Sequence, residues 1–105
     1  MPENNFEEFK VKLEKEHQFP CVYMFKFIIP ADNKKMAMAE AIFNEDVEIT
    51  QKTSSTGKYI SITAKQVSIN ADEIIQVYKK ALEIEGLMAF YIIKLIITGF
   101  SLNLL

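Results

Sequence analysis

Residues 47–65 read VEITQKTSSTGKYISITAK, and this stretch decides the fold. Apolar and polar residues alternate on both sides of the polar cluster 54–58. Such alternation is typical of two half-buried β-strands joined by a turn. Gly57 stands where the turn needs a positive φ, which glycine adopts without strain. The stretch therefore predicts a β-hairpin with one buried face and one polar face.

The alternation also assigns each hairpin side chain to a face of the sheet. The face expected beneath helices carries Val47, Ile49, Ile60, Ile62 and Ala64. The opposite face carries Glu48, Thr50, Lys52, Tyr59, Ser61, Thr63 and Lys65. We expect this second face to be polar and open to water or to a partner.

Two further strands flank the hairpin in the sequence. Residues 21–29, CVYMFKFII, are almost entirely apolar and are followed by Pro30. Their β-branched and aromatic content predicts a central strand that is buried on both faces or nearly so. Residues 87–92, LMAFYI, predict the last strand.

Helix signals separate these strands. Asp32 is a candidate N-cap for a helix over residues 33–43. Asn70 and Glu73 have capping-box spacing at the start of a second helix, and Gly86 is a candidate C′ residue after it. The apolar stripe of this helix comprises Ile74, Val77, Tyr78, Ala81 and Leu82. Residues 5–16 predict a short amphipathic helix or a frayed arm.

The resulting order of elements is strand, helix, strand, strand, helix, strand. With right-handed crossovers this order predicts an α+β, ferredoxin-like βαββαβ fold. Two helices then cover one face of a four-stranded antiparallel sheet, and an N-terminal helical arm precedes it. We expect an arm over residues 1–18, the ferredoxin-like domain over 19–92 and an apolar tail over 93–105.

Composition excludes several functional classes. The chain has 12 Lys, no Arg and 14 Asp plus Glu, for a net charge of −2, which argues against a nucleic-acid-binding protein. A single Cys and a single His exclude a disulfide framework and metal sites rich in these residues, so we expect no metal and no cofactor. His17 and Cys21 lie near each other in sequence, but we interpret them as a solvated imidazole and a small core residue.

The hairpin carries the candidate site residues. They are Lys52, Ser54, Ser55, Gly57, Lys58, Tyr59, Ser61 and Thr63. On one interpretation they are a polar turn and sheet face that contact a partner. On the other, the loop hydroxyls and amides form an anion site with Lys52 and Lys58.

The C-terminal stretch 90–105, FYIIKLIITGFSLNLL, has Lys94 as its single charged residue. Three interpretations stay open: an extension of the last strand, a membrane-associating tail, or the product of a frameshift or read-through. We favour an extension through about Ile97, because the Ile-rich run is a good strand former.

Three segments together carry a family resemblance. They are Phe19-Pro20, the hairpin residues 54–61 (SSTGKYIS) and residues 84–89 (IEGLMA). They resemble the YbeD-like family of small uncharacterised bacterial proteins, domain of unknown function 493, over about Phe19 to Phe90. The resemblance implies a fold similar to that of ACT regulatory domains. It supplies no catalytic residues, and the roles that it implies are regulatory or adaptor-like.

These observations favour a non-enzymatic, cytoplasmic regulatory or adaptor domain. It would bind a protein partner or small ligand through its sheet face or edge, as a monomer or a homodimer, and would bind no nucleic acid. The start of the chain, MPENNFEEFK, lacks the basic and apolar regions of a signal peptide. The alternative is a small enzyme with an anion site at the loop Ser54–Lys58.

Overall fold

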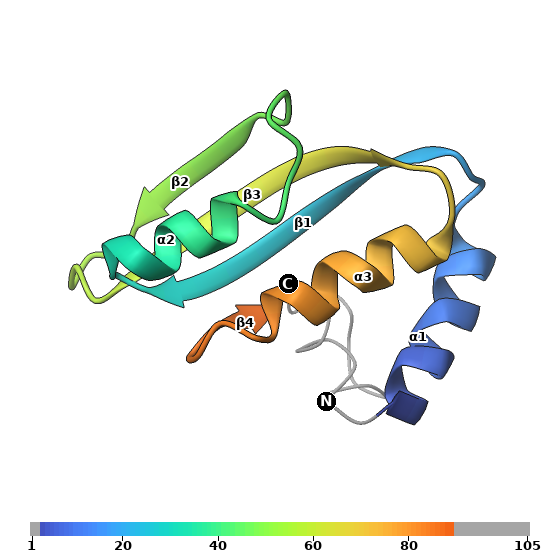
Figure 1. Ribbon diagram of the computed structural model, residues 1–105, viewed down its shortest axis with the longest axis horizontal. Helices are drawn as coiled ribbons and strands as arrows, with labels where there is room; N and C mark the ends of the chain where they lie inside the picture. The colour runs from blue at the N-terminus through green and yellow to red at the C-terminus, as the bar shows by residue number, and fades with distance from the viewer. Residues whose placement is uncertain (1–2, 90–105) are drawn as a thin grey trace.

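The computed structural model describes residues 3–89, which form three helices and one four-stranded antiparallel sheet (Figure 1). The elements are α1 (Glu3–Glu16), β1 (Cys21–Pro30), α2 (Asn33–Glu40), β2 (Ile49–Thr53), β3 (Tyr59–Ser68), α3 (Ala71–Ala81) and β4 (Met88–Ala89). The strand order is β2-β3-β1-β4. From β1 onward this is the ferredoxin-like βαββαβ arrangement that the sequence predicts.

The two long strands form the centre of the sheet. β1 and β3 pair in antiparallel register from Cys21↔Ser68 to Pro30↔Tyr59. β2 pairs with β3 on the other side, which confirms the predicted hairpin and places β2 at the edge of the sheet. β4 pairs with β1 at Phe27 and Ile28. The extension predicted for the last strand through Ile97 lies outside the described residues, as does the tail over 93–105.

α2 begins as predicted and ends early. Asp32 caps it, because its Oδ1 accepts hydrogen bonds from the backbone N–H groups of Lys34 at 2.8 Å and Lys35 at 3.4 Å. The helix ends at Glu40, three residues before the predicted boundary. There the chain tightens into i→i−3 hydrogen bonds, from Ile42 to Ala39 and from Phe43 to Glu40. Phe43 still reaches the core from this turn.

α3 has the predicted capping pair in a slightly different form. Asn70 Oδ1 accepts a hydrogen bond from the Glu73 N–H at 3.0 Å. Glu73 Oε1 accepts in turn from the Ile69 N–H at 2.7 Å, one residue before the N-cap. The prediction that Gly86 is the C′ residue is wrong. α3 ends at Ala81, and Gly86 lies in a later turn with φ +85°, where the chain passes close to Pro30.

α1 is part of the core rather than a frayed arm. Phe9 and Leu13 are fully buried, and the Phe9 ring lies 5.1 Å from the Tyr78 ring of α3. Lys10 Nζ also lies 3.1 Å from Asp72 Oδ1 of α3. The apolar stripe of α1 therefore has a partner that its own sequence does not reveal, and this packing orders the helix.

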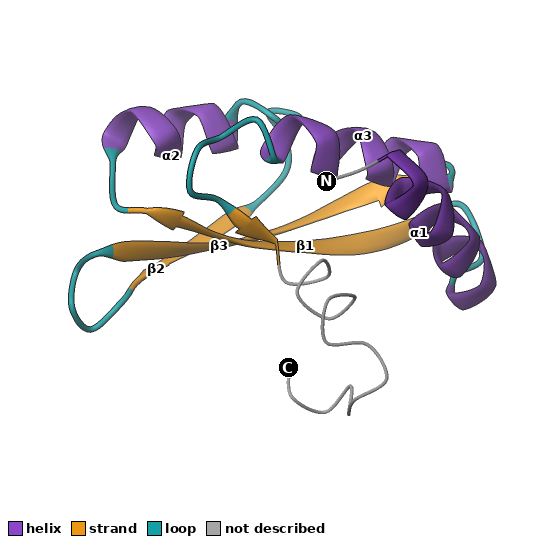
Figure 2. Ribbon diagram, turned by 90° about the horizontal axis from the view of Figure 1, so that it is seen from below, coloured by secondary structure: helices purple, strands orange, loops and turns teal. Residues whose placement is uncertain are grey.

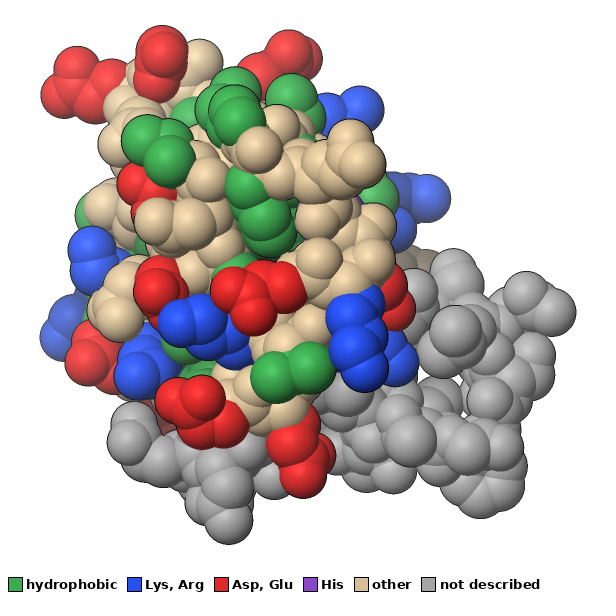
Figure 3. All heavy atoms as spheres, turned by 90° about the vertical axis from the view of Figure 1, so that its right-hand side faces the viewer, with side chains coloured by type: hydrophobic (Ala, Val, Ile, Leu, Met, Phe, Trp, Pro, Cys, Tyr) green, Lys and Arg blue, Asp and Glu red, His purple; other side chains and the backbone are tan. Residues whose placement is uncertain are grey.

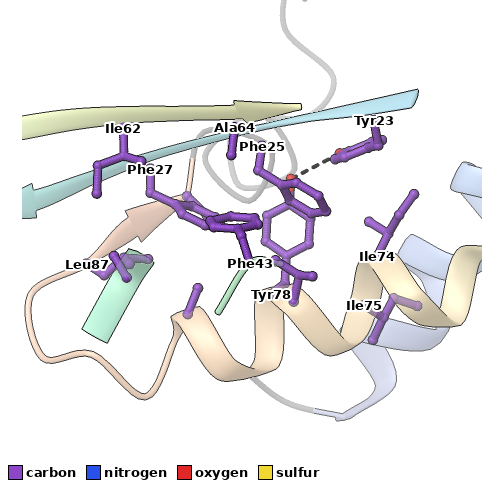
Figure 4. Packing of buried hydrophobic residues seen from close by; sticks show 14 of the residues in the cluster. Tyr23, Phe25, Phe27, Phe43, Ile62, Ala64, Ile74, Ile75, Tyr78 and Leu87 are labelled. Atoms are coloured by element: carbon purple, nitrogen blue, oxygen red, sulfur yellow. Dashed lines mark hydrogen bonds between the residues drawn. The ribbon is translucent and has the colours of Figure 1, made fainter. Parts of the chain in front are cut away.

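Helices α2 and α3 lie on one side of the sheet, α1 packs beside α3 at one end of it, and the core fills the space between helices and sheet (Figure 2). An aromatic cluster from β1 and α3 occupies its centre (Figure 4). The Tyr78 ring lies 5.5 Å from Phe25 and 5.7 Å from Phe27. The hydroxyls of Tyr23 and Tyr78 form a buried hydrogen bond of 3.0 Å. Burial raises the pKa of the Tyr23 phenol to about 12, and the hydrogen bond with Tyr78 offsets part of the rise.

β1 is central in the sheet, but it is buried on one face only. Tyr23, Phe25 and Phe27 are buried, whereas Val22 and Met24 are 64% and 53% exposed. The prediction of burial on both faces is wrong for the described residues, because the helix layer covers one side of the sheet and alternate side chains point to the other.

The two positive-φ glycines within residues 3–89 provide a matched stability test. Gly57 has φ +75° and open space where a Cβ would stand, whereas a Cβ at Gly86 would lie 2.8 Å from Pro30 Cγ. Gly57→Ala is expected to lower the free energy of unfolding by about 1 kcal/mol through backbone strain alone. Gly86→Ala adds overlap with the Pro30 ring, so its loss is expected to be about 1 kcal/mol larger. Urea unfolding measures the loss of stability in both variants. Equal losses in Gly57→Ala and Gly86→Ala would contradict the close approach of Pro30 to Gly86.

The buried tyrosine pair makes the free energy of unfolding depend on pH in the alkaline range. An unfolded tyrosine loses its proton near pH 10, whereas folded Tyr23 keeps its proton up to about pH 12. Between these values the unfolded state binds fewer protons, so the free energy of unfolding falls as the pH rises. We expect Tyr23→Phe to be about 1 kcal/mol less stable at neutral pH but to lose less stability on alkaline titration. Urea unfolding at a series of alkaline pH values measures the free energy of unfolding of both proteins. Parallel slopes of this free energy against pH for wild type and Tyr23→Phe would contradict the prediction.

Candidate functional site

The sheet surface opposite the helices is the candidate site, and we call it the open face. Its side chains follow from the strand register, because partners in an antiparallel pair point to the same side. They are Val22, Met24, Lys26 and Ile28 of β1, Thr50 and Lys52 of β2, Tyr59, Ser61, Thr63, Lys65 and Val67 of β3, and Met88 of β4. Glu48 precedes β2 at the margin of this face.

The open face is less polar than the hairpin sequence predicts. Val22 pairs with Val67 at one end, beside Met24. Ile28 and Met88 pair at the other end. Lys26, Thr63 and Thr50 form the row between these groups, and Lys52 and Lys65 lie in the rows of Ile28 and Met24. The apolar groups could not be predicted while residues 21–29 were assigned to a strand buried on both faces or nearly so. The alternation of CVYMFKFII, continued from its buried aromatics, places Val22 and Met24 outward.

Charge is segregated between the sheet and the rest of the molecule. Lys26, Lys52 and Lys65 are the charged residues of the four described strands, and all three lie on the open face. Carboxylates lie on the helices and connections instead. The side of the molecule shown in Figure 3 mixes both signs, and the Lys10–Asp72 ion pair connects α1 to α3. The open face is thus basic within a chain of net negative charge.

A cavity of about 510 Å³ lies at the hairpin end of the open face. Its lining residues are Ile28, Lys52, Thr53, Ser54, Ser55, Tyr59, Ser61 and Met88. The structure therefore brings together five of the eight predicted site residues, and adds Ile28 and Met88 from β1 and β4. Gly57 and Lys58 do not line this cavity. Thr63 lines a second cavity, of about 500 Å³, with Lys65 and Glu48.

The hairpin loop uses its own polar groups to hold its shape. Ser54 Oγ accepts a hydrogen bond from the Tyr59 N–H at 3.1 Å, and Thr56 Oγ1 accepts from the Lys58 N–H at 3.4 Å. The Gly57 N–H donates to the Ser54 carbonyl at 3.0 Å. An anion nest needs such amides to point at the ligand. The amides of Gly57 and Lys58 in the predicted anion loop, and that of Tyr59 after it, therefore already have partners within the hairpin.

Two further reactive side chains, His17 and Cys21, lie near the start of β1. The His17 ring packs against the Tyr23 ring at 5.5 Å, and Cys21 is a half-buried free thiol. Within residues 3–89 no group of three or more His, Cys, Asp or Glu side chains is placed to hold a metal ion. In the same part of the chain, no helix is long and apolar enough to cross a bilayer.

Comparison with known protein families assigns the chain to a family. The family model described as a protein of unknown function, DUF493, matches residues 14–90. The chain belongs to the DUF493 family. The match includes the whole sheet and the end of α1, and it confirms the resemblance drawn from Phe19-Pro20 and the hairpin. No curated protein and no solved structure matches the chain. The open face of this DUF493 protein therefore has to be interpreted from its own chemistry.

The loop hydrogen bonds of the DUF493 domain predict different roles for two neighbouring serines. Ser54→Ala removes the acceptor for the Tyr59 N–H and is expected to lower the free energy of unfolding by about 1 kcal/mol. Ser55 is exposed and stands outside this network, so Ser55→Ala is expected to stay within about 0.5 kcal/mol of wild type. Thermal or urea unfolding compares them; similar losses would assign the loop's stability to something other than the Ser54 hydroxyl.

Proposed function

We propose that this DUF493 protein is a non-catalytic regulatory or adaptor domain whose open face docks a partner. The observation that carries the proposal is the exposure of large apolar side chains on that face. Val22, Met24, Tyr59, Val67 and Met88 are each between 46% and 64% exposed. Apolar side chains that gather on one surface of a soluble domain are typical of interaction sites.

The layout of the sheet supports docking over catalysis. The open face combines a rigid backbone, fixed by the pairing of β1 with β3 over ten residues each, with hydroxyl, lysine and apolar side chains that can hydrogen-bond to a partner or pack against it. Lys52 and Tyr59 are the ionisable side chains that line the hairpin cavity. An enzyme that uses the Ser54–Lys58 loop as an anion site is the second candidate, and the cavity beside Lys52 is the observation in its favour.

The proposal includes a regulatory role of the kind that the ACT-like resemblance implies, in the bacterial cytoplasm. A single free thiol accords with a reducing compartment. In such a role the helix layer supplies stability and the opposite sheet face supplies recognition. The domain would act by presenting this face to a partner.

Two exposed methionines separate docking from folding. Met24 lies on the open face and is 53% exposed, whereas Met38 lies on α2 and is 41% exposed. Met24→Asp and Met38→Asp are both expected to keep stability within about 0.5 kcal/mol of wild type, since both sites face solvent. Crosslinking in native cells, followed by mass spectrometry, is expected to capture the same partner with wild type and Met38→Asp.

Met24→Asp is expected to lose that partner, because it places a carboxylate between the apolar groups of the open face. Unfolding curves of both variants provide the control for folding. Capture that survives Met24→Asp but is lost in Met38→Asp would place the interaction on the helix layer and contradict the proposal. Turnover of a phosphorylated or carboxylated substrate that depends on Lys52 would favour the enzyme instead.

A further inference from the structure

The three lysines of the open face are arranged around its hydroxyl groups. Lys26 of β1 lies opposite Thr63 of β3, and Thr63 pairs in turn with Thr50 of β2. Lys52 lies opposite Ser61. Lys65 lies opposite Met24, one row nearer the apolar end. The middle of the face is therefore a basic, hydrogen-bonding zone.

Two apolar groups flank Lys26 along β1. Val22 and Val67 form one group, and Ile28 with Met88 forms the other. Val22 and Ile28 are six positions apart on β1, which corresponds to about 20 Å along a strand. An α-helix covers that distance with about 13 residues. The open face thus has two apolar groups separated by the length of a short helix. Lys26 lies between them, and Lys52 and Lys65 lie beside them in the rows of Ile28 and Met24.

We propose that the occupant of the open face is an acidic amphipathic segment of a partner protein. This inference rests on the proposed docking function and names the chemistry of the partner. Apolar side chains at the two ends of the segment would pack on the Val22 and Ile28 groups. Carboxylates in its middle turns would meet Lys26, Lys52 and Lys65, and the hydroxyls of Ser61 and Thr63 would satisfy its remaining polar groups.

The arrangement favours a peptide over a membrane or a second copy. Lysines of a membrane-binding surface surround its apolar residues, so that the amines stay at the headgroups while the apolar residues enter the lipid. Here Lys26 lies between the two apolar groups, where a membrane would draw it below the headgroups. A second copy stacked on the same face would place three lysines near three others, which is electrostatically unfavourable.

The test uses a displayed library of random peptides about 15 residues long, enough for about four helical turns, selected on the full chain. Enriched peptides are expected to carry net negative charge between apolar ends. Their Kd is measured by fluorescence anisotropy against two triple variants with the same change in net charge. One is Lys26→Gln with Lys52→Gln and Lys65→Gln; the control is Lys15→Gln with Lys34→Gln and Lys80→Gln, all on the helix layer.

The open-face triple is expected to raise the Kd about tenfold, since exposed ion pairs are individually weak and three act together. The control triple is expected to leave it unchanged. Added salt is expected to weaken binding to the wild type more than to the open-face triple. Enrichment of neutral or basic peptides, absence of any enrichment, or equal effects of the two triples would overturn the inference.

Other occupants have their own signatures. Sedimentation of the chain with phosphatidylglycerol vesicles, lost in the open-face triple, would assign the face to a membrane. Self-association lost in Met24→Asp would assign it to a second copy. Acetylation of Lys26, Lys52 and Lys65 that is much slower than that of Lys15, Lys34 and Lys80 in the free monomer would show that the chain covers its own face. Each of these results overturns the inference.

The cellular capture experiment separates the docking function from the chemistry of its partner. If Met24→Asp loses the captured partner while the open-face lysine triple retains it fully, the docking function stands and the acidic chemistry is wrong. If neither variant affects capture, the docking function itself fails. Loss of the partner in both variants, with retention in the helix-layer triple, supports both.

Discussion

The buried ring of Tyr78 connects the parts of this domain. It lies on α3, contacts Phe9 of α1 at 5.1 Å and Phe25 of β1 at 5.5 Å, and shares a hydrogen bond of 3.0 Å with Tyr23. Its position fixes α3 over the sheet and gives α1 a surface on which to pack. The hydrogen bond between the Tyr23 and Tyr78 hydroxyls makes this contact directional, because a buried polar group without a hydrogen-bond partner is destabilising. These contacts together set the position of α3 on the sheet.

That position determines what the opposite face of the sheet presents. With Tyr23, Phe25 and Phe27 committed to the core, the alternation of β1 places Val22 and Met24 on the other side. One strand therefore contributes both to the stability of the domain and to its candidate interaction surface. Changes to the outward residues of β1 can alter recognition while the core stays intact.

The polar groups of the hairpin also divide between those that stabilise the turn and those that face the cavity. Ser54 and Thr56 hold the turn together through hydrogen bonds to the backbone, whereas Lys52 and Ser61 face the open cavity. Carboxylates are concentrated on the helices and connections, where they cap helices or pair with lysines, as Glu73 and Asp72 do. The basic character of the open face is a consequence of this distribution and not of the net charge of the chain.

Features that depend on neighbouring residues could be predicted from the sequence. The caps at Asp32 and Asn70, the hairpin and the positive φ of Gly57 all follow from interactions within a few positions, which local patterns record directly. The order of the strands followed as well, because few topologies satisfy the crossover rules. Only the tertiary structure decided the rest. α1 becomes part of the core through contacts with α3, Gly86 matters because Pro30 approaches it, and Val22 and Met24 are exposed because the helices cover one side of the sheet. Each of these depends on residues far apart in the chain, and periodicity defines two faces of a strand without stating which of them another layer will cover.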